Sequence, residues 1–220
     1  YNKQPLSIDE QIKRLQDRGM RIDDAARAKR YLTNIGYYRL SAYWLPFEPC
    51  CQTGQSRLHQ FQPGTTFDQV LSLYIFDRKL RLLVMEAIER IEISVRTHWA
   101  HALAMRHGSH AHLQASLFNS PFDHASDIAR MARELKGSRE TFIKHYLDHY
   151  DDPFLPPIWA VVETLSFGSL SRWFEATKDN SAKSAVSQDL GMPSVDITQK
   201  VLHALTPVRN ICAHHGRLWN

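Results

Sequence analysis

The most constraining feature of this sequence is one very long helical pattern in its middle. From about Phe67 to about Arg106, apolar side chains recur at the three- and four-residue spacing of a single helix face. They are Val70, Leu73, Tyr74, Leu80, Leu83, Ile88, Ile91, Val95 and Trp99. A helix of this length must bury its apolar face against partners. The sequence therefore favours a helical bundle built around this segment.

Shorter helical patterns lie on both sides of the long one. Before it, Ser7 and Glu10 form a capping box that begins one helix, Gly19 ends that helix, and a second helix runs from about residue 23 to Gly36. After it, we expect helices over 126–136, 138–149, 158–166, 169–178, 181–190 and 194–205. Because no convincing strand pair and no internal repeat is present, the predicted fold class is all-α.

The predicted organisation has three parts. Residues 1–48 form an N-terminal helical hairpin, residues 49–66 form a loop rich in Gly, Pro, Gln and Ser, and residues 67–220 form the helical bundle. The hairpin is similar to a helix-turn-helix, so a DNA-binding regulator stays an alternative. Trp159, Trp173 and Phe167 are expected in the bundle core.

The composition indicates in which cell compartment the protein works and which kinds of partner it binds. Three cysteines do not make a disulfide framework, two of them (Cys50 and Cys51) are adjacent, and Cys212 lies in an apolar segment. A reducing cytoplasm is the expected location. No apolar run is long enough to span a membrane, and no secretory leader is present. The net charge of +4 favours polyanionic partners.

The stretch from Thr206 to His214 carries the most chemistry. Thr206-Pro207 is typical of a helix start, with a hydroxyl cap followed by proline at the first helical position. Arg209 would then lie in the first turn, where free amides and the helix dipole attract phosphate. Asn210 and His214 are four residues apart and share one helix face, so Asn210 could orient the imidazole or the phosphate.

An arginine and a histidine beside a phosphate are sufficient to cleave RNA. The ribose 2′-hydroxyl is the nucleophile, so neither a metal nor a cofactor is expected. His214 would act as acid or base, and Arg209 would stabilise charge on the phosphorus centre. Since one histidine cannot easily act on both sides of the phosphorus, we expect a symmetric homodimer.

The same residues allow a structural interpretation. Arg209 could make an ion pair and His214 could be a satisfied interface histidine. The Arg-x4-His spacing by itself is weak evidence, because it recurs at Arg96 and His101.

Other clusters have two interpretations each. Tyr37, Tyr38 and Arg39 alternate aromatic and cationic groups with Tyr43 and Trp44, as base-stacking surfaces do, but core packing is the alternative. Arg217 is a further candidate for RNA contact. The charged side chains on the long helix either support the Arg209 site together with His215 or form ordinary bundle ion pairs; they are Arg78, Arg81, Glu92 and Arg96.

Two pairs of histidines are candidate metal ligands. His145 and His149 have a zinc-compatible spacing, as do His98 and His101, but each pair lacks a third strong ligand. We therefore expect no metal. His107, His110 and His112 fall in a predicted loop over 107–125 and are expected at the surface.

Several stretches, taken together in order, resemble the Abi-like family of abortive-infection proteins of the AbiD/AbiF type. The similar segments are residues 35–44, 73–81, 88–97, 157–160, 166–171 and 209–215. Within the last of these, Arg209-Asn210-x-x-x-His214 resembles the Arg-x4-6-His signature of HEPN domains.

The resemblance implies a HEPN-type helical bundle, a toxin-like role in bacterial phage defence, an RNA substrate and a homodimer. It also implies kinship with the HEPN nuclease modules of type VI CRISPR effectors and a possible small noncoding RNA partner. A non-catalytic RNA-binding protein that partners such an RNA is the alternative function. One HEPN subgroup is silenced by nucleotidylation of a tyrosine two residues after the motif histidine. That position is Gly216 here, so this control is not expected.

Overall fold

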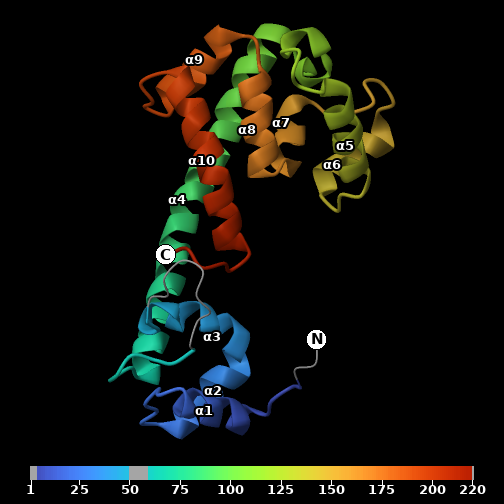
Figure 1. Ribbon diagram of the computed structural model, residues 1–220. Coiled ribbons are helices and arrows are strands. Elements are labelled where there is room, and N and C mark those ends of the chain that lie inside the picture. Colours follow the sequence, from blue (N-terminus) through green and yellow to red (C-terminus); the bar gives the residue numbers. More distant parts are fainter. Residues whose placement is uncertain (1–3, 50–58, 220) are drawn as a thin grey trace. The chain divides into compact units, whose positions relative to one another are not determined.

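The computed structural model describes residues 4–49 and 59–219 (Figure 1). This part of the chain consists of α-helices and short 3-10 turns and contains no β-strand, only two isolated bridges. The all-α prediction is therefore confirmed. Cys50 and Cys51 lie outside the described residues.

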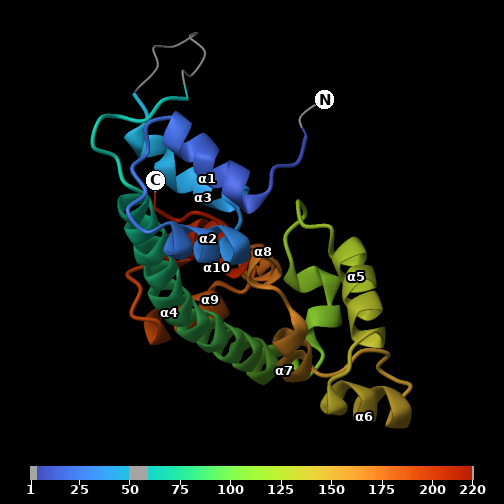
Figure 2. The same ribbon diagram turned by 90° about the horizontal axis from the view of Figure 1, so that it is seen from below.

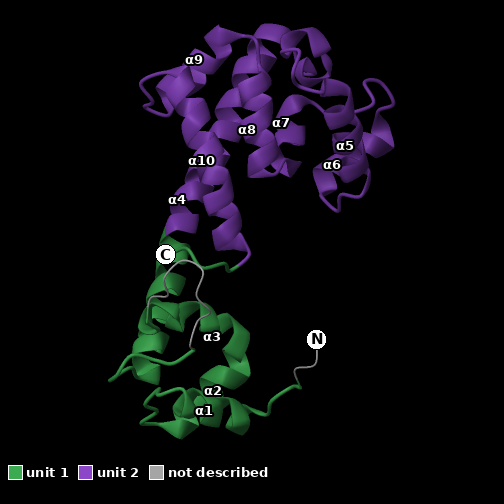
Figure 3. Ribbon diagram, in the orientation of Figure 1, with its two compact units in different colours: residues 1–83, 215–220 green, residues 84–214 purple. Residues whose placement is uncertain are grey.

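The chain divides into two compact units. Unit 1 comprises residues 1–83 and 215–220, and unit 2 comprises residues 84–214 (Figure 3). The first division falls inside the long helix α4 (Phe67–His107), whereas the sequence places a boundary where this helix begins. The second division falls between His214 and His215.

Unit 1 is built on the N-terminal helices α1 (Ile8–Asp17), α2 (Ala25–Ile35) and α3 (Tyr37–Trp44). The predicted capping box is present at the start of α1, because Ser7 and Glu10 exchange hydrogen bonds. α1 and α2 pack as a hairpin (Figure 2). Gly36 has a φ of +87°, which allows the chain to turn sharply between α2 and α3. The core of this unit contains Leu15, Leu32, Leu40, Tyr43, Trp44, Val70 and Leu71.

Unit 2 surrounds the second part of α4. Its other helices are α5 (His124–Lys136), α6 (Thr141–His149), α7 (Ile158–Val161), α8 (Phe167–Ala176), α9 (Asn180–Asp189) and α10 (Val195–Ala213). Trp99 of α4 is buried beside Trp173 of α8, and its indole N–H donates to the Thr177 hydroxyl at 3.1 Å. Phe167 and Trp173 are therefore core residues, as predicted.

Three burial predictions are wrong. Leu83 and Trp159 are 66% and 54% exposed. Leu83 has the spacing of the apolar face, but it is the last residue of unit 1 in α4 and lies beyond the core of that unit. His112 is 1% exposed, because the segment after α4 forms 3-10 turns that pack inward and carry this side chain into the interior.

None of the described helices combines the length and apolar composition that a bilayer crossing requires.

Candidate active site

The predicted helix start at Thr206-Pro207 is wrong. α10 runs without interruption from Val195 to Ala213, with Pro207 inside it. The Thr206 hydroxyl donates to the Leu202 carbonyl at 3.0 Å and caps nothing. Proline removes one helix hydrogen bond, but Leu202, Leu205 and Val208 pack in the core of unit 2 and hold the helix together. Arg209 consequently lies in the last turns of the helix, where the dipole does not attract phosphate.

Arg209 instead belongs to a cluster of charged side chains in unit 2. Its Nε lies 3.6 Å from Oε2 of Glu92, a carboxylate that is almost fully buried. The other oxygen, Oε1, accepts a hydrogen bond from Nη2 of Arg96. Arg96 also donates to the Leu165 carbonyl at 2.7 Å and lies 3.8 Å from Glu163. Residues from α4, from the segment before α8 and from α10 thus meet at one point.

The cluster has more positive than negative charge around Glu92. Two guanidinium groups share that single buried carboxylate, and the third partner, Glu163, is half exposed. The Nε atoms of Arg96 and Arg209 are buried and have no hydrogen-bond partner. The Arg209 side chain keeps 29% of its surface exposed. The arrangement leaves a partly exposed guanidinium beside a carboxylate that it shares, and the exposed part of such a group can bind anionic oxygens.

Asn210 and His214 lie beside Arg209 at the end of α10. His214 is the C-cap residue, and its backbone N–H donates to the Asn210 carbonyl at 2.9 Å. Both side chains are exposed. No hydrogen bond joins the two side chains among the described residues, so the predicted orientation of the imidazole by Asn210 is not formed here. The structure therefore brings together Arg209, Glu92 and Arg96 and leaves His214 open to solvent.

The candidate RNA-binding residues 37–39 and 217 belong to unit 1. Tyr37 packs edge-to-face on Trp44 and accepts a hydrogen bond from Arg18. Tyr38 is 91% exposed. Arg39 donates to the His215 carbonyl at 2.8 Å, and Arg217 donates to the Ala42 carbonyl. Of the four residues, Tyr38 is the one that presents a free aromatic ring.

Arg81 also belongs to unit 1 and has its own partner there. It pairs with the fully buried Asp77, which also accepts a hydrogen bond from the Tyr43 hydroxyl at 2.6 Å. Asp77 further accepts the backbone N–H groups of Leu218 and Trp219. This set holds the C-terminal tail, residues 215–219, against the helices of unit 1.

The two remaining residues that were predicted to support the Arg209 site, Arg78 and His215, are both exposed. Arg78 is exposed and takes part in none of the ion pairs between described residues. His215 is exposed, lies just outside α10 and has a φ of +57°.

Sequence reasoning missed three groups that shape these sites. Glu163 and the Leu165 carbonyl reach Arg96 from a segment far along the chain, and no local pattern identifies them. Asp77 is different, because an acidic residue on the core face of a helix, four residues before Arg81, does indicate a buried ion pair.

The histidine pair of α6 makes a hydrogen bond within its own helix. The His145 and His149 rings lie 4.2 Å apart, but Nδ1 of His149 is bonded to the His145 carbonyl of its own helix. Over residues 4–49 and 59–219, no three His, Cys, Asp or Glu side chains converge as a metal site requires.

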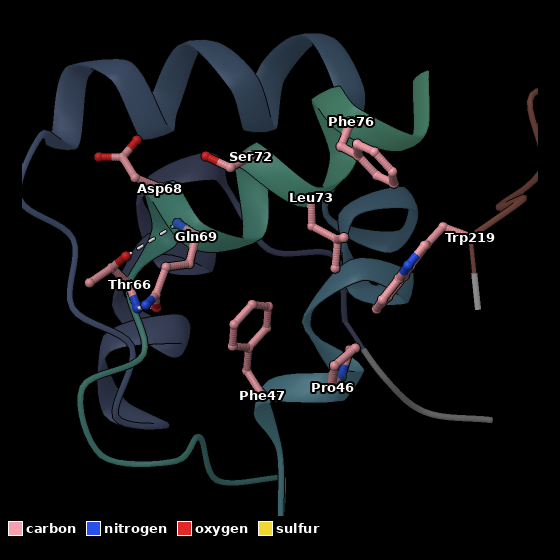
Figure 4. A pocket seen from close by; sticks show the side chains of 9 residues that line it. All are labelled: Pro46, Phe47, Thr66, Asp68, Gln69, Ser72, Leu73, Phe76 and Trp219. Atoms are coloured by element: carbon pink, nitrogen blue, oxygen red, sulfur yellow. Dashed lines mark hydrogen bonds between the residues drawn. The ribbon is translucent and has the colours of Figure 1, made fainter. Parts of the chain in front are cut away.

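A further pocket lies in unit 1. It has a volume of about 600 Å³ and is surrounded by Phe47, Leu73, Phe76 and Trp219, with Thr66 and Gln69 joined by a capping hydrogen bond at its edge (Figure 4). Its lining is mainly apolar and contains no histidine or arginine, so it lacks the groups that phosphate chemistry needs.

Comparison with known proteins gives one match. The family model of Abi-like proteins matches residues 30–220. No curated protein and no solved structure matches the chain. Because the family model covers most of the chain, including α10 and the charged cluster, this protein belongs to the Abi-like protein family.

Proposed function

We propose that this protein is a metal-independent endoribonuclease of the HEPN superfamily that acts in bacterial phage defence, as an abortive-infection or toxin-like protein. The observation that carries the proposal is Arg209. Its guanidinium lies beside a buried carboxylate that it shares with Arg96, and 29% of its side-chain surface stays exposed. Membership of the Abi-like family supports the defence role.

The proposed chemistry uses the substrate's own nucleophile. Arg209 binds the scissile phosphate and stabilises the charge that grows on it during attack by the ribose 2′-hydroxyl. His214 moves a proton, either from the 2′-hydroxyl or to the leaving 5′ oxygen. Asn210 contacts the phosphate or the imidazole once substrate is bound. Because the nucleophile is internal, the reaction requires no metal-activated water.

The position of His214 also bears on the alternative function. Its ring has no orienting partner among the described residues, and catalytic histidines normally have one. The alternative function is therefore RNA binding without cleavage, for example binding of a small noncoding partner RNA. In that case Arg209 would bind a phosphate of the RNA in the same way, and His214 would not be needed for binding.

The test compares His214→Ala and Arg209→Ala with wild type in cells and in purified form. Both variants should abolish growth arrest and the appearance of new RNA ends in sequencing. Arg209→Lys should rescue poorly, because lysine keeps the charge but loses the planar fork. Cleavage by the purified protein should persist in excess chelator.

His149→Ala is the matched control, because His149 is also an exposed histidine at the end of a helix in unit 2. It should leave cleavage unchanged. Equal growth arrest from wild type and all variants would refute the nuclease, and loss of cleavage in chelator with recovery on adding zinc would point to His145 and His149 instead.

A further inference from the structure

A polar pocket lies between α8 and α10 in unit 2, where the two helices run side by side (Figure 1). Its volume is about 330 Å³. The start of α8 contributes Ser166, Gly168, Ser169, Ser171 and Arg172, and α10 contributes His203 and Thr206. This lining contains hydroxyl, guanidinium and imidazole groups and no carboxylate.

Gly168 explains how the helices come so close. A Cβ atom at this position would lie 3.1 Å from Cγ2 of Thr206, which is tighter than ordinary side-chain contacts allow. The absence of a side chain brings the first turn of α8 directly against α10. The free amides of that first turn are therefore next to the pocket, at the end of a helix that attracts anions.

Ser171 adds a hydroxyl to the pocket. The residue is 6% exposed and lines the pocket, and its hydroxyl has no hydrogen-bond partner among the described residues. Because this hydroxyl opens into the pocket and is not used by the rest of the described protein, it is available to bond a ligand oxygen there. His203 is exposed and is likewise without a partner in the described part of the chain.

The charge at the pocket is positive. Arg172 lies 3.4 Å from Asp127, but that buried carboxylate already pairs closely with Arg130. Two arginines therefore share one acid, and Arg172 retains charge for a ligand. Hydroxyl donors, helix amides and an arginine together select an anion with several oxygens, such as a phosphate.

We propose that this pocket binds a phosphate of the RNA strand, beside the one held by Arg209. Thr206 lines the pocket, and Arg209 follows it by three residues on α10, so the two side chains are neighbours on the helix surface. A strand following α10 would place one phosphate at the pocket and another at Arg209. This inference rests on RNA being the substrate, as proposed above, but not on RNA being cut.

The test measures binding in place of cleavage. Arg172→Gln, Ser171→Ala and His203→Ala are made in the His214→Ala background, and the affinity for a labelled single-stranded RNA is measured over a range of salt concentrations. Arg172→Gln should weaken binding about tenfold at low salt and lower the slope of log affinity against log salt by about one. Ser171→Ala and His203→Ala should each weaken binding several-fold.

Arg133→Gln is the matched control. Arg133 is an exposed arginine of α5 that does not line the pocket, so this variant should leave both the affinity and the salt slope unchanged. Pocket variants that bind RNA as tightly as their parent, or a parent that binds no RNA, would overturn the proposal. Competition by inorganic phosphate without any effect of the variants on RNA affinity would do so too. If the pocket variants weaken RNA binding while the wild type shows no cleavage, the phosphate-binding role of the pocket is supported and the proposed nuclease activity is refuted.

Discussion

At the residue scale, the buried His112 makes a defined contribution to stability. Both of its ring nitrogens are buried without a hydrogen-bond partner. Burial, with smaller contributions from His110 and His124, lowers its pKa from 6.5 to about 3. The fold therefore keeps this imidazole neutral, whereas the unfolded chain protonates it near pH 6.5. Stability from this group is complete above pH 6.5 and is lost as the pH falls from there toward 3.

We expect unfolding in urea to show this dependence. The free energy of unfolding should fall by about 2 kcal/mol between pH 7 and pH 5 on account of this one group, since each unit of pKa difference corresponds to about 1.4 kcal/mol. The variant His112→Leu should lack this part of the fall. The exposed His149→Ala should keep it. An equal fall in wild type and His112→Leu would show that other groups are responsible.

At the element scale, Asp77 of α4 secures the C-terminal tail of unit 1. Its carboxylate is fully buried and accepts from the Tyr43 hydroxyl, the Arg81 guanidinium and two backbone N–H groups of the tail. Burial, with a smaller contribution from Asp77, raises the pKa of Tyr43. Tyr43 is therefore protonated at neutral pH and donates to Asp77.

We expect Asp77→Asn to destabilise the protein by about 3 kcal/mol, because it leaves Arg81 buried without its anion. Urea unfolding should report this loss, and trypsin should then cut at Arg217 in the released tail. Asp68→Asn is the control on the same helix, because Asp68 forms an exposed ion pair with Arg27 and should matter little. Unchanged stability and protease resistance in Asp77→Asn would contradict this role.

The elements also show what the sequence could and could not predict. The capping box of α1, the length of α4 and the pair of Glu92 with Arg96 follow from local spacing and are all present. The start at Thr206-Pro207 failed because local cap preferences compete with packing, and the apolar side chains of α10 on both sides of Pro207 contact one core. The support of Arg209 by Glu92 was one of two interpretations that the sequence left open, and spacing alone could not choose between them because the pair joins helices far apart in the sequence.

At the scale of the whole molecule, the proposed chemistry predicts a two-fold dimer. One His214 reaches only one side of the phosphorus, so a second copy supplies the other. The partner would meet α10 along Pro207, Asn210 and His214, which are exposed, and not along Cys212, which is buried in its own chain. Phosphate should strengthen the dimer by screening the facing Arg209 side chains, and high salt should weaken RNA binding.

Light scattering should give twice the mass of the chain. Excess His214→Ala added to wild type should reduce cleavage through mixed dimers, whereas excess His149→Ala should not. A strictly monomeric protein that cleaves at full rate would show that one chain completes the site.

The return of the chain from α10 to unit 1 has a consequence for the order of folding. Unit 1 is discontinuous, because residues 1–83 need the tail to complete it, and all of unit 2 lies between them in the sequence. On the ribosome, Asp77 emerges long before Leu218 and Trp219. Until those two residues are made, its carboxylate lacks the two backbone N–H groups that donate to it in the folded protein. Unit 2 can form its core during synthesis, but unit 1 can reach its final state only after the end of α10 has been made.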